Sequence, residues 1–368
     1  MFPDYLYRWI YLIFCTIFVL VHNSKINTYR GRNAVSAFGF STRNIAVIFF
    51  VFIVIYIGTR PLSVVFTDMY AYAGFYKLRV FDDPDVRGGE IVWSYYQKIC
   101  YYVFGMSSTV WLFTVTLLSM TLRYYACKNI FKENVLTGFL FIITSFSFWA
   151  LATNIIRSDL ALSCALFGLS IIIKGKSWRK YLWAFILFYL ALTIHKSSAL
   201  LVLSFCASYF VLKDIKWAIG FWVLCVLLSL FFHSYFESFF IGIGFDDRLE
   251  RALTTEDDLG VFSHSGFRWD FLLYSIVPIV LGWFVSKKSE DQTYTTLLNT
   301  YIVANGFWVL VIRALFSDRF AGISWSLYGL VIAYPLLKVG IWKNQPKMVS
   351  FGLTGQLLFL WLMQMYYL

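Results

Sequence analysis

The chain has 368 residues, of which 60% are hydrophobic and 14% charged, and its formal net charge is +11. Soluble domains are about 45–50% apolar and about 25% charged, so this composition excludes a water-soluble globule. Long apolar runs recur along the chain and predict one integral membrane domain over residues 1–368.

Twelve apolar runs are candidate membrane spans. Lipid offers no water to open backbone groups, so each span is expected to be a helix. The predicted fold class is all-α, a polytopic membrane helical bundle of about 12 transmembrane helices, with the first run retained rather than cleaved as a signal peptide. The runs are Leu6–His22, Asn44–Gly58, Thr109–Arg123, Val135–Ala152, Leu160–Ile173, Tyr181–Ile194, Ser198–Leu212, Trp217–His233, Phe271–Ser286, Thr296–Ile312, Phe320–Leu337 and Val349–Leu368.

The connections between these runs alternate in charge. Every second connection is basic, and together these connections hold 18 of the 31 basic residues but only four acidic ones. Basic loops stay in the cytoplasm, which predicts a multi-pass protein with both termini outside. The positive charge therefore serves orientation, and no nucleic-acid partner is expected. The basic connections are centred on Lys25–Arg43, Arg123–Lys132, Lys174–Lys180, Lys213–Lys216, Lys287–Lys288 and Lys338–Lys347.

One alternative changes this topology. The segment Tyr181–Leu212 can also be read as a single helix, which gives eleven spans and buries His195 in the middle of the membrane. Everything downstream would then face the other way, so that the acidic loop Phe236–Asp270 would be cytoplasmic and Lys287–Lys288 external. The charge pattern favours two helices with a break at His195.

Two long loops lie on the predicted outer side. The first, residues 59–108, contains Asp68, several tyrosines, an acidic turn and an aromatic-rich run, Ile91–Phe104. Both of its flanks are expected to be amphipathic helices at the membrane interface, where Tyr and Trp prefer to lie. The second outer loop covers residues 234–269 and is rich in Asp, Glu and Arg.

The stretch Asn154–Ser198 is the most informative part of the chain. Arg157 precedes one apolar run, a basic loop follows that run, and a second apolar run leads to His195 and Lys196. If both runs cross the membrane, Arg157 and His195 lie on the same side. The basic loop between the two runs predicts that this side is external.

Ionisable side chains on the outer side are the candidate site residues. Arg and Lys bind phosphate oxygens, and Asp or His can take a proton from a sugar hydroxyl. We assign Asp68 and His195 as alternative catalytic bases, which the sequence does not rank. The candidate pyrophosphate ligands are Arg157, Arg319, Arg60, Arg248 and Lys196.

Other classes of site are less well supported. A divalent metal would have to use Asp83 and Asp85, an Asp-Pro-Asp turn, and we expect neither a metal nor another cofactor. There is no Walker loop. A transporter or flippase predicts charged residues in the middle of several spans, and the predicted spans carry their polar groups at the outer rim instead.

These residues also carry a family resemblance. The segment Arg157-Ser-Asp-Leu-Ala-Leu, followed by an apolar run, a basic loop and His195-Lys-Ser-Ser-Ala-Leu, resembles the EpsG-like family of Wzy-type polysaccharide polymerases. Thr67-Asp68-Met-Tyr70-Ala-Tyr72 is similar to the family's Asp/Tyr segment, and Asp318-Arg319 to its C-terminal Arg. Ser158 departs from the family pattern, which often has Gln after the Arg.

The resemblance implies a fold related to the GT-C glycosyltransferases and a place in the bacterial inner membrane. It implies the joining of oligosaccharide repeat units on undecaprenyl pyrophosphate at the outer side, to make O-antigen, capsule or exopolysaccharide. The expected partners are that lipid-linked oligosaccharide, the bilayer, and a chain-length regulator and a flippase of the same pathway.

The sequence leaves other functions open. An O-antigen ligase or a polyprenyl-linked sugar transferase needs the same chemistry and would have similar residues. A lipid-linked oligosaccharide flippase or transporter belongs to a different class, as does a scaffold without catalysis. A scaffold predicts that changes at Arg157 or His195 leave polymer length untouched.

Overall fold

A computed structural model describes residues 3–26, 42–83, 90–232, 235, 267–313 and 317–366. These residues form helices and no strand, which confirms the all-α prediction for the described part of the chain. Contacts divide the chain into two compact units, one of Met1–Lys196 with Ile332–Leu368 and one of Ser197–Val331. The single domain expected over residues 1–368 stays a prediction.

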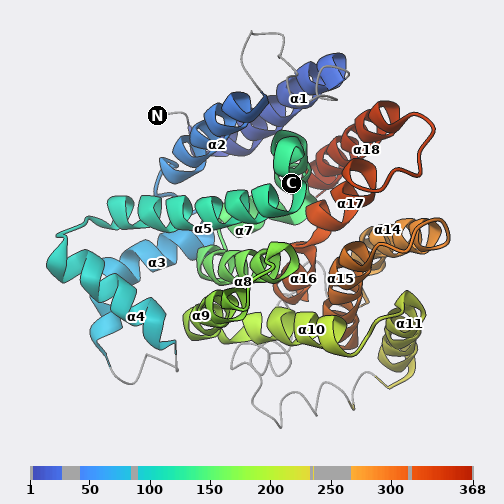
Figure 1. The fold of residues 1–368 in the computed structure, drawn as a ribbon. Coiled ribbons are helices and arrows are strands. Elements are labelled where there is room, and N and C mark those ends of the chain that lie inside the picture. Colours follow the sequence, from blue (N-terminus) through green and yellow to red (C-terminus); the bar gives the residue numbers. More distant parts are fainter. Residues whose placement is uncertain are drawn as a thin grey trace. The chain divides into compact units, whose positions relative to one another are not determined.

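The first unit contains the two segments that the sequence singled out around Arg157 and His195. Its chain begins at the blue end of Figure 1 and runs to the green helices. Its helices are α1 (Tyr7–Lys25), α2 (Thr42–Gly58), α3 (Thr67–Lys77), α4 (Ile91–Lys98), α5 (Ser108–Phe131), α6 (Val135–Ile143), α7 (Phe146–Thr153), α8 (Ile156–Lys174), α9 (Arg179–Ile194) and α18 (Gln345–Tyr366).

Six helical segments of the described chain are long and apolar enough to cross a membrane. Three further apolar helices are shorter, Arg43–Gly58, Lys196–Phe210 and Ile215–Phe231. The protein is therefore a polytopic membrane helical protein, and the count of twelve spans stays a prediction. The long segments are Asp4–Lys25, Ser108–Ile143, Ile156–Lys174, Trp269–Ser286, Ser317–Leu337 and Gln345–Tyr366.

Helix α8 is the centre of the first unit. It packs along both α5 and α9, and most of its side chains are buried. Gly168 permits the close approach of α9, because a Cβ at this position would lie 2.8 Å from the Phe188 ring. Small residues let helix backbones approach closely in membranes. Helix α9 also carries the exposed side chains of Trp183, Phe185 and Tyr189.

Hydrogen bonds join the helices of the first unit at both of its ends. At one end, Tyr56 donates to the carbonyl of Tyr7 over 2.6 Å, and the hydroxyl of Ser63 donates to Asp4. At the other end, Lys174 donates to Asn129 over 3.0 Å. Asp4 at the first end lines one cavity with Phe66, directly before α3, and with Thr153 at the end of α7.

A buried ion pair corrects one part of the predicted topology. Arg123 was expected in a basic cytoplasmic connection, but α5 continues to Phe131 and encloses it. Its guanidinium pairs with Asp159 of α8 and donates from Nε to Ser163 over 2.9 Å. Both charged side chains are 2% exposed. Because Asp159 neutralises Arg123, the helix can carry this charge through its interior.

The Arg123–Asp159 pair places two charged side chains inside candidate spans. The expectation that no charges lie inside the spans is wrong for Arg123 and Asp159, which belong to two candidate spans. The two side chains are paired with each other and hidden from solvent. They therefore tie α5 to α8 and are not placed like groups that line a water-filled path.

One predicted span differs in detail from the structure, and the alternative topology is settled. The run Val135–Ala152 is split into α6 and α7, because Thr144 and Ser145 donate their hydroxyls back to the carbonyls of Leu140 and Ile142. Such local bonds compete with a continuing helix. The alternative of a single helix over Tyr181–Leu212 is wrong, and the predicted break at His195 is confirmed. Helix α9 ends at Ile194, and the backbone of His195 is extended, with φ −153° and ψ 115°.

The second unit packs around α15 (Gln292–Leu310), which contacts α10 (Ala199–Phe210), α11 (Ile215–Phe231), α14 (Trp269–Ser286) and α16 (Ser317–Trp325). The helix α17 (Tyr328–Leu337) connects this unit to the first in sequence. Figure 1 shows the chain of this unit from yellow-green to orange.

A buried amide joins four helices of the second unit. Asn305 of α15 accepts from the Trp222 indole over 2.8 Å. Its NH₂ group donates to Ser275 over 3.1 Å and to Ser324 over 3.0 Å. Interhelical hydrogen bonds of this kind hold membrane helices together where no hydrophobic effect acts between them.

Candidate functional site

The carboxylate of Glu90 joins the two residues that the sequence singled out. Its Oε2 accepts a hydrogen bond from Arg157 Nη1, and its Oε1 lies 2.7 Å from His195 Nδ1. Arg157 is the second residue of α8, His195 ends α9, and Glu90 directly precedes α4. The expectation that Arg157 and His195 lie on one side of the protein is confirmed, because both contact the same carboxylate.

All three side chains are largely withdrawn from solvent. The exposed fraction is 13% for Glu90, 14% for Arg157 and 9% for His195. Charges interact more strongly at such positions than at an open surface. Arg157 Nε is buried and has no hydrogen-bond partner in the described chain. A buried guanidinium with an unused N–H is suited to a further anionic group.

The contact with Glu90 selects one tautomer of His195. An ionised carboxylate can only accept hydrogen bonds, so the proton of the neutral imidazole is on Nδ1. Nε2 is then the nitrogen that can take a proton from another group. The pair Glu90–His195 has the arrangement of a general base whose ring is oriented by a carboxylate.

Helix ends position the three residues. His195 is held by the hydrogen bond of its backbone N–H to the carbonyl of Ala191, which closes α9. Glu90 stands at the N-terminus of α4, where the helix dipole favours a negative charge. Both predicted flanks of the outer loop 59–108 are indeed helical, as α3 and α4.

Asp68 lies beside this group on α3. Its backbone N–H donates to Asn154 Oδ1 over 2.8 Å, and Asn154 is three residues before Arg157. One helical turn further on, the ring of Tyr72 lies 5.7 Å from the Arg157 guanidinium. Residues four apart share a helix face, so Asp68 lies on the face of α3 that carries Tyr72.

An aromatic cluster supports this face of α3. Tyr72 meets Trp93 of α4 edge to face with ring centres 5.9 Å apart. Trp93 contacts Trp111 of α5, which stacks on Tyr76 with ring centres 4.5 Å apart. Such aromatic pairs add to the packing of the rings. The cluster fixes α3 and α4 on the end of α5, and thereby holds Glu90 near Arg157.

Arg60 occupies a different environment from the one expected of a ligand. It is 2% exposed, donates from Nε to the carbonyl of Thr153 over 3.0 Å and from Nη1 to that of Ile57 over 2.6 Å. Burial lowers the pKa of Arg60 to about 10, so it stays protonated at neutral pH. Its contacts fix the end of α7, directly before Asn154.

The other three predicted ligands differ in their surroundings. Lys196 follows His195 and has an exposed side chain. Arg319 is half-buried on α16 of the second unit. Arg248 lies outside the described residues. The geometry therefore brings together Arg157, His195 and Asp68, with Glu90 and Asn154 as additional members.

Glu90 was not among the site residues predicted from the sequence. The residue is 67 positions from Arg157 and 105 from His195, and it stands in a loop with several other acids. One signal was available, because Glu90 directly precedes the aromatic-rich run that forms α4. A negative charge at the start of a helix is stabilised by the helix dipole.

The acidic turn before Glu90 has other contacts. Asp82 accepts from the Tyr102 hydroxyl over 2.5 Å and lies 3.3 Å from Lys98 Nζ. The hydrogen bond from Tyr102 holds the pKa of Asp82 below its usual range. Asp85 lies outside the described residues. Within the described ranges, no three His, Cys, Asp or Glu side chains gather as metal ligands.

Comparison with known proteins identifies the family of this chain. No curated protein and no solved structure matches the chain. The model of the EpsG family matches residues 43–368, a range that contains Asp68, Glu90, Arg157, His195 and Arg319. It covers most of the sequence and both compact units. The resemblance seen in the sequence is therefore confirmed, and the chain belongs to the EpsG family.

Proposed function

We propose that this protein is a polysaccharide polymerase, a glycosyltransferase that joins oligosaccharide repeat units carried on undecaprenyl pyrophosphate. The proposal places the reaction at the outer side of the bacterial inner membrane, in a fold of about twelve spans related to the GT-C glycosyltransferases. Its main support is the shared contact of Arg157 and His195 with Glu90. The EpsG family is associated with Wzy-type polymerases, which supports the reaction class.

The reaction joins an acceptor hydroxyl to the anomeric carbon of the donor sugar. The new bond forms between the hydroxyl oxygen and that carbon, while the bond from the carbon to the pyrophosphate oxygen breaks. The bonding electrons leave with undecaprenyl pyrophosphate. The hydroxyl proton passes to Nε2 of His195, and Glu90 stabilises the imidazolium through Nδ1. The lipid pyrophosphate supplies the leaving group, so the step needs no nucleotide.

Arg157 is assigned to the leaving group. Negative charge develops on the pyrophosphate as the glycosidic bond breaks, and a preorganised cation lowers the barrier. The buried Nε of Arg157, which has no partner among the described residues, supplies a donor for a phosphate oxygen. Loss of one such donor costs about 2.7–4 kcal/mol in other enzymes. Arg319, Lys196 and Arg248 are proposed to add positive charge around the same group.

Asp68 and Arg60 are given separate roles in the proposed reaction. Asp68 is retained as the alternative base, because it lies on the face of α3 that carries Tyr72. Arg60 is proposed as a positioning residue, since its Nε donates to the carbonyl of Thr153, directly before Asn154, and its Nη1 to the carbonyl of Ile57. This division predicts that Arg60→Lys retains part of the activity and that Arg157→Lys retains less, because bidentate binding needs the guanidinium.

Complementation in the source strain tests the proposal. His195→Ala, Arg157→Ala and Glu90→Gln are expressed at matched levels, and the surface glycan is separated on a gel. A lost polymerase leaves single repeat units, whereas a lost flippase leaves none outside. Lys77→Ala is the matched control, an exposed cation on α3, and should give a full ladder. Full ladders from all three site variants would contradict the assignment.

A further inference from the structure

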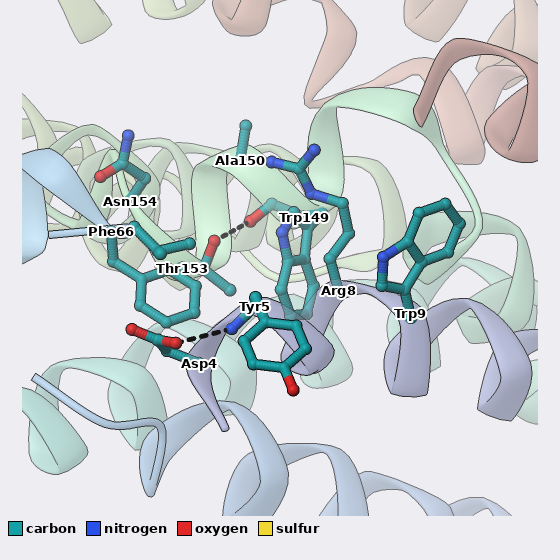
Figure 2. Close-up of a pocket in the computed structure, with 10 residues that line it drawn as sticks. Asp4, Tyr5, Arg8, Trp9, Phe66, Trp149, Ala150, Thr153 and Asn154 are labelled. Carbon is teal, nitrogen blue, oxygen red and sulfur yellow. Dashed lines mark hydrogen bonds between the residues drawn. The ribbon is translucent and has the colours of Figure 1, made fainter. Parts of the chain in front are cut away.

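The first unit has a cavity at Asn154, three residues before Arg157 of the proposed site. It has a volume of about 330 Å³ and is formed by the start of α1, the residues before α3 and the end of α7. Figure 2 shows its aromatic lining, Tyr5, Trp9, Phe66 and Trp149, together with Arg8 and Asp4. Cavities that bind small molecules have volumes of about 300–1,000 Å³, so this one is large enough for a single sugar ring.

Arg8 is the unusual member of this lining. It is half-buried, and within the described chain no hydrogen bond or ion pair is formed by its guanidinium. It is also the second residue of α1, where the helix dipole disfavours a positive charge. Both features are unfavourable to an isolated Arg. An anionic group in the cavity would satisfy the guanidinium and would also face the positive end of the helix.

The other side chains favour a ligand with polar and apolar faces. Trp149 is 5% exposed and held at one side by Tyr11, with ring centres 4.5 Å apart. Asp4 and Asn154 contribute polar groups to the same cavity. Flat indole rings offer an apolar surface to the C–H face of a pyranose, and carboxylate and amide groups bind its hydroxyls. Arg8 adds selectivity for an acidic substituent.

Two lining residues of the cavity also contact Asp68 and Arg60. Asn154 lines the cavity and also accepts from the backbone N–H of Asp68 over 2.8 Å. Thr153, another lining residue, accepts through its carbonyl from Arg60. A chain of sugars whose reacting end is at His195 would therefore extend toward this cavity past Asn154.

We propose that this cavity is a sugar subsite that binds one acidic pyranose of the oligosaccharide substrate, with its carboxylate on Arg8. The inference rests on the proposed function only in taking the repeat unit as the source of this sugar. It goes beyond that function by naming a substrate class, a sugar that carries a carboxylate. The cavity residues bind the sugar and take no part in the transfer of the glycan.

Saturation-transfer NMR tests the subsite with glucuronate and glucose as probes. The purified full-length protein is placed in phosphatidylcholine nanodiscs. Glucuronate should receive saturation from the protein and glucose less. Arg8→Gln should reduce the glucuronate signal by about threefold or more, because the charge-assisted bond is lost, while Arg8→Lys should retain more of it. The Lys77→Ala control should match the unchanged protein, and size-exclusion profiles show that each variant is folded.

Three outcomes would overturn the subsite. The first is equal signals from glucose and glucuronate, and the second is a glucuronate signal that Arg8→Gln leaves intact. The third is loss of the glucuronate signal when phosphatidylglycerol replaces phosphatidylcholine, since an anionic lipid headgroup then occupies the cavity. His195→Ala keeps the two proposals apart: it should abolish polymer and leave the glucuronate signal unchanged.

Discussion

His195 Nδ1 lies 2.7 Å from Glu90 Oε1, so the residue that ends α9 is hydrogen-bonded to the residue that precedes α4. The other carboxylate oxygen of Glu90 accepts from Arg157 at the start of α8. One side chain of the loop 59–108 thus contacts both a candidate base and a candidate phosphate ligand.

Replacing Glu90 by Gln should reduce polymerisation by about 10²-fold. The amide keeps the size of the side chain but cannot stabilise an imidazolium or neutralise Arg157. The rate is measured with purified protein and lipid-linked repeat units, from the appearance of longer glycans. Glu133→Gln, an exposed residue of the connection between α5 and α6, serves as control. A normal rate for Glu90→Gln would exclude the role of Glu90 in proton transfer.

The ion pair of Arg123 and Asp159 should show strong coupling. Either Arg123→Leu or Asp159→Leu alone leaves a buried charge without its partner and should cost about 3–5 kcal/mol of stability. The double variant should cost less than the sum of the two, because no charge is left. Thermal unfolding in detergent measures all three. Additive losses would show that the two side chains do not interact.

A larger side chain at Gly168 should disturb the site from a distance. Gly168→Leu would collide with the Phe188 ring and push α9 away from α8, which would move His195 relative to Arg157. We expect a shorter glycan ladder at normal protein levels. Gly355→Leu is the comparison, because nothing lies within 4 Å of a Cβ there. If both variants give the same ladder, the spacing of α8 and α9 does not control the site.

The acidic turn before Glu90 provides a prediction of pH dependence. Since the Tyr102 hydrogen bond lowers the pKa of Asp82, the ionised carboxylate stabilises this turn above its unfolded pKa. That contribution is lost as the pH falls through the lower folded pKa. Tyr102→Phe should therefore raise the pKa of Asp82 toward its usual value. Carbon NMR of labelled Asp side chains measures the change, and an unchanged titration would contradict the contact.

The sequence predicted the position of Arg157 and His195 because their relation depends on chain direction. Two helices joined by a short basic loop return the chain to the side where it started. The break at His195 was predicted for the same reason, and α9 does end at Ile194. Glu90 escaped prediction because its partners are more than 60 residues away, and only packing brings α4 onto α9.

Arg123 shows why loop boundaries were less predictable. A charge near the end of an apolar run was read as the start of a connection, whereas the helix continues for eight more residues to Phe131. Hydropathy describes one residue at a time and does not record that Asp159 on another helix cancels the charge. Pairing across helices can therefore lengthen a span beyond its apolar part.

The carboxylate of Glu90 couples Arg157 to His195. Arg157 and His195 both contact Glu90, so neither can exchange this partner without affecting the other. A pyrophosphate that competes for the Arg157 guanidinium changes the charge that His195 meets at Glu90. In the proposed reaction, binding of the lipid pyrophosphate at Arg157 and proton acceptance by His195 would thereby be linked through Glu90.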